Sequence, residues 1–387
     1  MQPYAFKTTA SILSLSAVSN ASTLITGIIP QLQRAYPKVP TTVIESLVTI
    51  ANLSALVTLL INPWLTAHWG VRRTVIASLL LSAATGLVPA ISTNFGLIMV
   101  SRVLLGLGIG GFSPHAISLI THFFHGDYRA RLLGYQTGLA ALGNAVLLGL
   151  AGLLVTLSWH AVFWLYALLA GVAGLVARYV AEPPVSPTAA QPGTRRRASL
   201  PRRQRLLVLL TFGTYVLIWG VQLKLPSYFA ERHLGPAQLL NFTLAAMNIG
   251  GFLAGLSFGA LHRKMARQTL TLGYAGAAVA VAVLWWTTST PLAVSAAIGF
   301  NWIYSYTGPY LVFTSHVGLA PAQINTLSST LTIATILSAF CAPLLWNWLG
   351  HFGGASLTTN VLFWIMTSLS LLAILSLILN RKQAKSK

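Results

Sequence analysis

The sequence predicts an all-α integral membrane protein with twelve transmembrane helices in two pseudo-symmetric six-helix halves. Three observations predict this class: an apolar composition, twelve long apolar segments, and sequence features that recur at a nearly constant spacing. Of the 387 residues, 55% are hydrophobic and only 7% are charged, whereas a soluble chain carries about 25% charged residues. A chain with so little polar surface belongs in a membrane.

Twelve apolar segments are long enough to cross a bilayer, which takes about 20 residues of helix. They cover residues 8–30, 41–61, 74–91, 95–123, 132–157, 161–180, 206–229, 237–261, 269–288, 292–315, 324–349 and 357–380. No small-residue cleavage site follows Lys7, so we expect the first segment to be retained. A single cysteine, Cys341, excludes an internal disulfide.

The basic residues predict the orientation of the spans, because cytoplasmic connections collect Lys and Arg. One set of connections holds only Arg34, Lys38 and Arg232. The opposite set and the two termini hold Lys7, Arg72, Arg73, Arg129, Arg131, Arg178, Arg195, Arg196, Arg197, Arg202, Arg203, Arg205, Arg263, Lys264, Arg267, Arg381, Lys382, Lys385 and Lys387. This asymmetry predicts a multi-pass protein of the cell membrane with both termini in the cytoplasm. It accounts for the net charge of +20 without a nucleic-acid partner.

The domain organisation follows from the one long polar connection, residues 182–204, which separates an N-terminal six-helix half, 1–181, from a C-terminal six-helix half, 205–387. Its Pro, Ala and Arg content is typical of a linker. Contact with anionic membrane lipids explains its arginines more simply than a phosphate-binding role. Features recur between the halves at offsets of 195 to 200 residues: Ile29-Pro30 with Leu225-Pro226, Ala51-Asn52 with Met247-Asn248, Leu65 with Leu261, Ser113-Pro114 with Gly308-Pro309, and Phe163-Trp164 with Phe363-Trp364. The repeat indicates duplication of a six-helix unit.

A short basic connection, residues 62–73, lies between the second and third spans. It contains Leu65, Gly70, Arg72 and Arg73 in the order of a known transporter signature. Its charges cannot lie in hydrocarbon, so it fixes the side of the membrane on which the neighbouring spans end.

The fourth span carries Arg102 followed by glycines at positions 106, 108, 110 and 111. Together with the 62–73 connection, this motif resembles the major facilitator superfamily (MFS) of secondary transporters, and the resemblance covers essentially the whole chain. In style the chain is similar to bacterial drug and small-solute efflux members. It departs from the superfamily at Ala67, where the first signature has an acid, and at Gly143-Asn144, where antiporters carry Gly-Pro.

The resemblance implies an MFS fold that works by alternating access, with a solute cavity lined by the first, fourth, seventh and tenth spans. Polar side chains on these spans are therefore candidates for binding substrate. On the seventh span, Tyr215, Trp219 and Gln222 share one helical face, and the offset of 196 maps them onto a polar face of the first span. The candidate substrate-binding residues are Ser19, Thr23, Thr26, Arg102, His115, Tyr215, Trp219, Gln222, Lys224, Asn301 and Tyr304.

The tenth span is the most aromatic in the sequence and offers two faces to the cavity. Trp302 and Tyr306 share one face, while Asn301 and Tyr304 share the other. The sequence leaves open which face meets the solute, and the face with Asn301 is the better candidate.

Arg102 and Glu45 are the candidates for proton coupling. A charge inside a span is costly unless it is paired or wetted, and the resemblance associates the matching arginine with coupling. Snorkelling to the headgroups is the alternative for Arg102 and Lys224, and an interfacial position is the simpler interpretation of Glu45. The candidate gating and motif residues are Leu65, Gly70, Arg72, Arg73, Asp127, Gly106, Gly110, Pro114 and Pro309, with Arg72 or Arg73 expected to pair with Asp127.

The functional prediction is a secondary transporter of small organic solutes, with proton-linked efflux as the first choice. A uniport or symport permease for a polar or anionic metabolite is one alternative, and a non-transporting membrane sensor is another. With only four acidic residues in the chain, the cavity should suit neutral or anionic solutes rather than cationic drugs. No enzymatic motif, cofactor site or metal-ligand spacing is present, and we expect a monomer whose partners are a solute, protons and lipids.

Overall fold

The computed structural model describes residues 6–183, 199–266, 268–316 and 319–385. The described residues are mostly helical and contain no strand. The chain divides into two compact units, Met1–Thr194 and Arg195–Lys387, and each is described by itself. Part of the predicted linker, including Arg195, Arg196 and Arg197, lies outside the described residues, as do Arg267 and Lys387.

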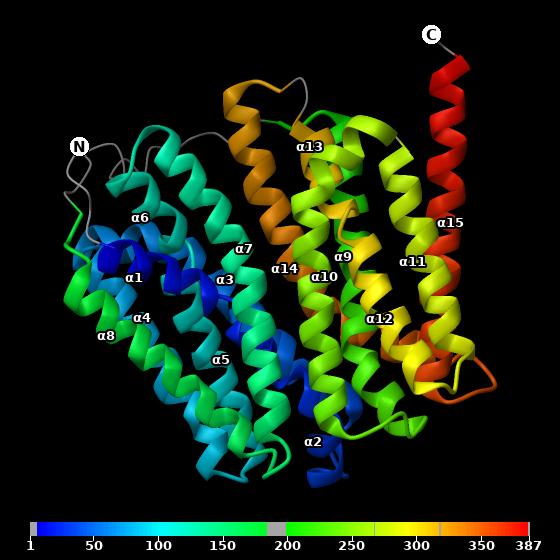
Figure 1. Cartoon of the computed structure of the whole chain (residues 1–387), viewed down its shortest axis with the longest axis horizontal. Helices are drawn as coiled ribbons and strands as arrows, with labels where there is room; N and C mark the ends of the chain where they lie inside the picture. Colours follow the sequence, from blue (N-terminus) through cyan, green and yellow to red (C-terminus); the bar gives the residue numbers. More distant parts are fainter. Residues whose placement is uncertain (1–5, 184–198, 267, 317–318, 386–387) are drawn as a thin grey trace. The chain divides into compact units, whose positions relative to one another are not determined.

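The helices of the first unit follow one another in the order expected for six spans (Figure 1). They are α1 (Phe6–Ala17), the 3₁₀ helix η1 (Ala21–Ile28), α2 (Ile29–Ala35), α3 (Thr41–Trp69), α4 (Val71–Ile91), α5 (Phe95–Phe112), α6 (His115–Phe123), α7 (Gly126–Leu154), the 3₁₀ helix η2 (Ala161–Tyr166) and α8 (Ala167–Tyr179). The helix α4 packs against both α5 and α8, and α3 packs against the other side of α5.

The second unit repeats this plan. It consists of α9 (Arg202–Glu231), α10 (Ala237–Met265), α11 (Gln268–Trp286), α12 (Thr290–Tyr304), α13 (Thr307–His316), α14 (Pro321–Gly350) and α15 (Leu357–Lys385). In Figure 1 the red helix α15 runs beside α11, and these two helices pack together closely. The helix α12 lies between α10 and α11, in the same way that α5 lies between α3 and α4.

Ten of the described helices are long and apolar enough to cross a membrane, and a bent pair formed by α1 with residues 21–35 makes an eleventh. The remaining predicted span, 292–315, is split into α12 and α13 around Ser305 and Tyr306. The first span was predicted as one helix, but it bends by 44°. The predicted connection 62–73 is also shorter than expected, because α3 continues to Trp69 and the chain turns at Gly70.

Glycines let α5 approach both of its neighbours. A Cβ atom on Gly106 would lie 2.0 Å from the carbonyl oxygen of Ala51 in α3, and one on Gly108 would lie 2.1 Å from the hydroxyl oxygen of Ser82 in α4. No side chain fits at such distances. The glycine motif of the fourth span therefore fixes the spacing of three helices.

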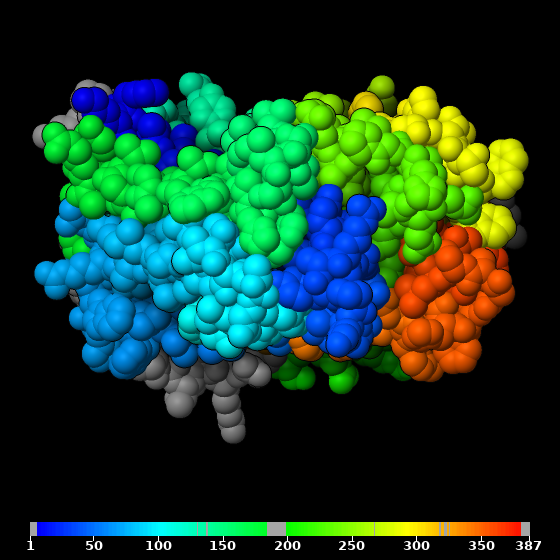
Figure 2. Space-filling model, turned by 90° about the horizontal axis from the view of Figure 1, so that it is seen from below, coloured from blue at the N-terminus to red at the C-terminus, as the bar shows by residue number. Residues whose placement is uncertain are grey.

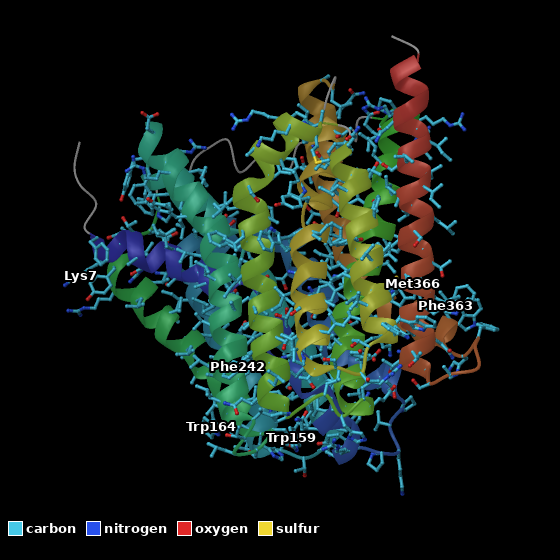
Figure 3. The ribbon with its side chains drawn as sticks, turned by 45° about the vertical axis from the view of Figure 1, so that its right-hand side comes forward. Lys7, Trp159, Trp164, Phe242, Phe363 and Met366 are labelled. Carbon is cyan, nitrogen blue, oxygen red and sulfur yellow. The ribbon has the colours of Figure 1, made fainter. Side chains whose placement is uncertain are left out.

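Aromatic side chains gather where the helices of each unit end. Figure 3 shows Trp159 and Trp164 near one end of the first unit and Lys7 near the other. In the second unit, the orange-red connection between α14 and α15 lies near the yellow end of α11 (Figure 2), and Trp285 and Phe352 line a shared cavity of about 560 Å³ there. Aromatic residues at helix ends are typical of a membrane–water interface.

Candidate functional site

Arg102 is the most enclosed basic side chain among the described residues of the first unit. The helix α5 begins at Phe95 and is capped by Asn94, whose side chain accepts a hydrogen bond from the backbone N–H of Leu97, so Arg102 stands two turns inside the helix. Only 1% of Arg102 is exposed. An arginine at this depth does not snorkel, because its guanidinium is held inside the unit.

Every hydrogen bond of the Arg102 guanidinium goes to a neutral oxygen. Nε donates to the carbonyl of Leu47 at 2.9 Å, Nη1 to the hydroxyl of Tyr166 at 2.6 Å, and Nη2 to the carbonyl of Ser22 at 2.6 Å. The Tyr166 hydroxyl in turn donates to the carbonyl of Ala21 at 2.9 Å. One cation therefore joins η1, α3, α5 and η2, and its charge is not neutralised by these partners.

Glu45 lies close to this network along the chain. It stands in α3 two residues before Leu47, whose carbonyl accepts a bond from Arg102. Its exposed fraction is 0%, so the side chain is enclosed within the unit. The two coupling candidates therefore sit at neighbouring levels of the same unit.

The first-span candidates form a ladder of local hydrogen bonds. The hydroxyl of Ser19 donates to the carbonyl of Ser16, and that of Thr26 donates to the carbonyl of Thr23. Thr23 reaches furthest, because its hydroxyl also contacts the amide oxygen of Asn144 in α7 at 2.9 Å. The contact between Thr23 and Asn144 joins the bent first span to α7.

His115 belongs to a second buried cluster rather than to the Arg102 network. Its Nε2 lies 2.9 Å from the amide oxygen of Asn62, and its Nδ1 lies 3.0 Å from the hydroxyl of Ser118. The Asn62 oxygen is an acceptor, so Nε2 must carry the proton and Nδ1 must accept from Ser118. The Asn62 amide nitrogen donates to the carbonyls of Gly110 and Gly111.

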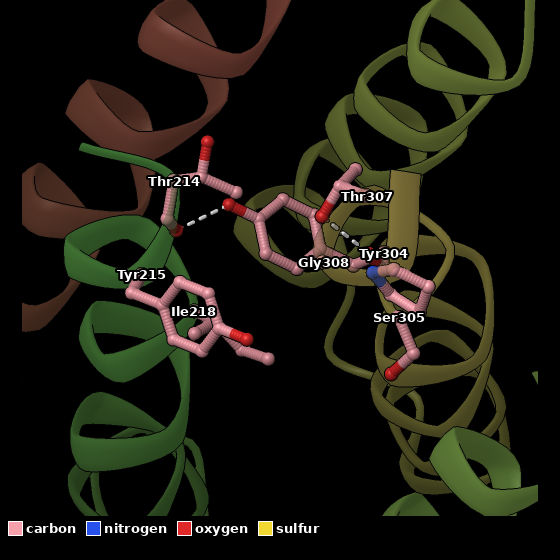
Figure 4. A pocket seen from close by; sticks show the side chains of 8 residues that line it. Thr214, Tyr215, Ile218, Tyr304, Ser305, Thr307 and Gly308 are labelled. Atoms are coloured by element: carbon pink, nitrogen blue, oxygen red, sulfur yellow. Dashed lines mark hydrogen bonds between the residues drawn. The ribbon is translucent and has the colours of Figure 1, made fainter. Parts of the chain in front are cut away.

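The second unit holds a cavity of about 110 Å³ between α9 and the break from α12 to α13 (Figure 4). Eight residues line it: Thr214, Tyr215, Ile218, Tyr304, Ser305, Thr307, Gly308 and Pro309. The Tyr304 hydroxyl donates to the backbone carbonyl of Thr214, and the Thr307 hydroxyl donates to the backbone carbonyl of Tyr304 at 2.7 Å. The structure thus brings two predicted site residues, Tyr215 and Tyr304, to one cavity.

The other candidates of the second unit lie beyond this cavity, further along α9 and α12. Lys224 is 1% exposed and donates to the amide oxygen of Asn347 in α14 at 2.6 Å. Gln222 reaches the amide oxygen of Asn301 at 3.5 Å, and the Asn301 nitrogen donates to the carbonyl of Met247 at 2.5 Å. Trp219 is half-buried. Asn301 therefore packs between helices, while Trp302 on the opposite face is 44% exposed.

The turn between α3 and α4 is fastened by an acid that the sequence did not single out. The carboxylate of Glu182 accepts hydrogen bonds from the backbone N–H groups of Val71 at 2.6 Å and Arg72 at 3.2 Å. It thereby caps the first turn of α4, where a negative charge is stabilising. Gly70 has a φ of +81°, and a Cβ atom there would lie 2.6 Å from the Glu182 carboxylate. Only glycine suits this position.

The expected pairing of Arg72 or Arg73 with Asp127 is not found among the described residues. The Arg72 guanidinium donates to the backbone carbonyl of Ala177 at the end of α8. Asp127 is exposed in the first turn of α7. The acid at this turn is therefore Glu182, and it bonds the backbone of the motif rather than an arginine side chain.

This contact gives a prediction about Glu182. We expect Glu182→Gln to speed hydrogen exchange at the amides of Val71 and Arg72 by about two- to fivefold, because a neutral amide caps a helix less well than a carboxylate. Hydrogen–deuterium exchange on the full chain measures this. Asp127→Asn is the matched control and should leave these amides unchanged; the reverse pattern would restore the sequence-based pairing.

Three important partners were missed by sequence reasoning: Tyr166, Asn347 and Glu182. Each contacts its partner from a distant part of the sequence. For Asn62 a signal was present, because Pro114 lacks the N–H that would bind the Gly110 carbonyl, and a helix break of this kind requires a substitute donor nearby.

The two helical units, with charged and polar side chains enclosed inside them, define a polytopic membrane transporter. The sequence profile of the Major Facilitator Superfamily matches residues 11–332. The chain belongs to this superfamily.

Solved structures of the same fold confirm the architecture. A bacterial homologue of the human lysosomal transporter Spinster, in an inward-facing and unoccupied conformation, is 14% identical with a TM-score of 0.72, over 98% of this chain and 96% of that one. A D-xylose-proton symporter is 14% identical with a TM-score of 0.73, over 97% of both chains.

Curated relatives match over shorter stretches. A 3-(3-hydroxy-phenyl)propionate transporter of Escherichia coli (strain K12) is 25% identical over 48% of this chain and 47% of that protein. A probable 4-methylmuconolactone transporter of Cupriavidus pinatubonensis is 22% identical over 62% and 59%. A probable chloroplastic anion transporter of Arabidopsis thaliana is 35% identical over 23% and 17%. The match thus spans about half the length of the first of these relatives.

Proposed function

We propose that this protein moves small organic anions across the cell membrane by alternating access, with protons as the coupling ion, and that it exports them. In this proposal the chain works as a monomer with both termini in the cytoplasm. The class of solute is the part of the proposal on which the structure bears most directly.

The observation that carries the proposal is the pair of cations inside the spans. Arg102 and Lys224 are each 1% exposed. The acceptors that surround the Arg102 guanidinium are two carbonyls and a phenol, and Lys224 donates to an amide oxygen. The neutral acceptors of Arg102 leave its positive charge in place, and in a medium of low dielectric constant the field of this charge attracts anions and repels cations.

The positions of the acidic residues also favour anions over cations. Asp127, Glu182 and Glu231 are exposed at helix ends, which leaves Glu45 as the carboxylate inside a span. The described spans therefore enclose two basic side chains, one in each unit, and a single carboxylate. The names of two relatives point the same way, because one transports a propionate and another is a probable anion transporter.

Proton linkage is supported by the position of Glu45. This carboxylate is enclosed in α3 near the Arg102 network, where a proton taken up or released would change the local charge. We propose Glu45 as the proton-carrying group and Arg102 as the fixed charge beside which it works.

The test is solute flux in proteoliposomes with an imposed pH gradient. We expect the gradient to drive flux of an aromatic carboxylate such as 3-phenylpropionate in the wild type but not in Glu45→Gln. We expect Lys224→Met to weaken the apparent affinity for this anion by about tenfold, which corresponds to 1.4 kcal/mol. Lys264→Met, at an exposed position in α10, is the matched control and should behave as the wild type.

Other outcomes distinguish the alternatives. Anion flux that ignores the pH gradient would indicate uniport, and gradient-driven uptake in the direction of the protons would indicate symport. Export of a permanent cation that survives Glu45→Gln would overturn the anion proposal. The absence of flux for every solute tested would favour a sensor.

A further inference from the structure

Two prolines break spans at corresponding places in the two units. Pro114 follows α5, and Pro309 lies in the first turn of α13. Each proline lacks the N–H that would bind the carbonyl four residues earlier. The carbonyls of Gly110 and Ser305 therefore lose their helical partners.

In the first unit this carbonyl receives a substitute donor. The side-chain amide of Asn62, from α3, donates to the Gly110 carbonyl at 3.1 Å, and His115 holds the amide in place through its oxygen. A buried carbonyl without a donor costs about 1–3 kcal/mol, so the amide stabilises the break. The polar groups here are all used within the protein.

In the second unit the corresponding donor is missing. The offset of 196 residues that relates α3 to α10 places Phe258 where the first unit has Asn62. The neighbouring Ser257 contacts the hydroxyl of Tyr306 at 2.8 Å. This part of α10 therefore lies beside the break between α12 and α13, as the corresponding part of α3 lies beside the break at Pro114. Among the described residues no donor bonds the carbonyl oxygen of Ser305.

Besides the Ser305 carbonyl, a second polar group at this cavity has no hydrogen-bond partner among the described residues: the hydroxyl of Tyr215. This hydroxyl comes within 3.1 Å of the place that a Cβ atom on Gly308 would occupy. The hydroxyl groups of Tyr304 and Thr307 already donate their hydrogen bonds to backbone carbonyls, so neither proton remains for a solute. Two residues that line the cavity (Figure 4) therefore carry groups without a partner among the described residues: the Ser305 carbonyl, which is an acceptor, and the Tyr215 hydroxyl, which is a donor.

We propose that this cavity is a subsite for a hydroxyl group of the transported anion. A hydroxyl donates one hydrogen bond and accepts others, so it satisfies the Ser305 carbonyl and the Tyr215 hydroxyl together. The cavity volume of about 110 Å³ suits a hydroxyl and the carbon atoms that carry it, since an engineered cavity of about 150 Å³ holds a benzene ring. The inference rests on the proposed function and names its solute class, hydroxylated organic acids.

The experiment compares acids that differ by one hydroxyl. The probes are 3-(3-hydroxyphenyl)propionate with 3-phenylpropionate, lactate with propionate, and malate with succinate, each measured by flux competition in proteoliposomes of the full chain. For the pairs that the wild type transports, we expect the hydroxylated member to compete about tenfold or more better, because a site built to bind a hydroxyl discriminates against its absence.

Two variants should remove this preference. Tyr215→Phe deletes the donor, and Phe258→Asn supplies the amide that the first unit uses to occupy its carbonyl. Both should bring the ratio within each pair close to one, and this ratio is taken within each variant, so that a change in its overall flux does not enter the comparison. Tyr306→Phe is the matched control, because the Tyr306 hydroxyl is bonded to Ser257 and Trp302 outside the cavity, and it should keep the preference.

The inference and the proposed function fail in different ways. Anion flux with equal competition by both members of every transported pair would overturn the hydroxyl subsite and leave the proposed function standing. A preference that survives both variants would also overturn the subsite. The absence of flux for all six acids would overturn both.

Discussion

Replacing Arg102 by alanine is expected to abolish transport and to lower the melting temperature of the protein more than any other single substitution in the first unit. The change removes the donors of the Leu47, Ser22 and Tyr166 oxygens and leaves a void at the meeting point of η1, α3, α5 and η2. An unsatisfied buried acceptor costs about 1–3 kcal/mol, and some of this is recovered by relaxation, so we expect a loss of about 3 kcal/mol.

Two further variants separate the charge of Arg102 from its geometry. Arg102→Lys keeps the charge but has a single nitrogen, which cannot reach three acceptors on different helices. We expect it to recover part of the stability and less than about one-hundredth of the flux, a loss of about 2.7 kcal/mol in transport. Tyr166→Phe removes one acceptor and should cost about 1 kcal/mol. Thermal unfolding in detergent and flux in proteoliposomes measure these effects; an Arg102→Lys protein with full flux would show that charge alone suffices.

The spans could be predicted from the sequence because hydrocarbon imposes a length of about 20 apolar residues on each helix. The breaks within spans are harder to predict. Pro114 and Pro309 lie at visible breaks, but Pro63, Pro89, Pro226 and Pro343 lie inside continuous helices. Whether a proline breaks a span depends on the groups that neighbouring helices offer its freed carbonyl, and one sequence does not show these neighbours.

The candidate site was predictable where a charge or a face of a helix marks it. Arg102 and Lys224 are conspicuous because charges are rare in spans, and the structure finds both enclosed. The partners of these two residues could not be predicted, because they are distant in the sequence: Tyr166 stands 64 residues from Arg102, and Asn347 stands 123 residues from Lys224. The turn at Gly70 shows the same limit: the sequence shows that its usual acid is missing, but the acid that binds there, Glu182, comes from the segment after α8.

Gly106→Ala is expected to destabilise the first unit by about 2–3 kcal/mol although alanine is the better helix former. Helix propensity alone favours alanine over glycine by about 1 kcal/mol. Here the added methyl group would lie 2.0 Å from both the Ala51 carbonyl oxygen and the Ser54 hydroxyl oxygen. Over-packing of this kind costs about 1–3 kcal/mol, occasionally more, and the backbone of α3 must move because a carbonyl cannot be repacked as a side chain can.

The matched control is Gly149→Ala in α7, where nothing lies within 4 Å of the new methyl group. We expect this variant to be as stable as the wild type or more stable, since propensity acts without a clash. Thermal unfolding of the two purified variants decides the point, and equal melting temperatures would show that α3 and α5 separate freely. Adding Ser54→Ala to Gly106→Ala should rescue little stability, because the Ala51 carbonyl remains in the way.

The second unit explains why the clash at Gly106 should be so costly. At the corresponding place α12 carries Asn301, whose amide nitrogen donates to the carbonyl of Met247 at 2.5 Å. The two equivalent helix pairs are therefore joined in different ways. In the second unit the side chain of Asn301 bridges the space between α12 and α10, and in the first unit Gly106 lets α5 and α3 come into direct contact. The two solutions require different helix spacings, so neither residue can be exchanged for an intermediate one: alanine at position 106 is too large for the closed contact and too short to bond across an open one.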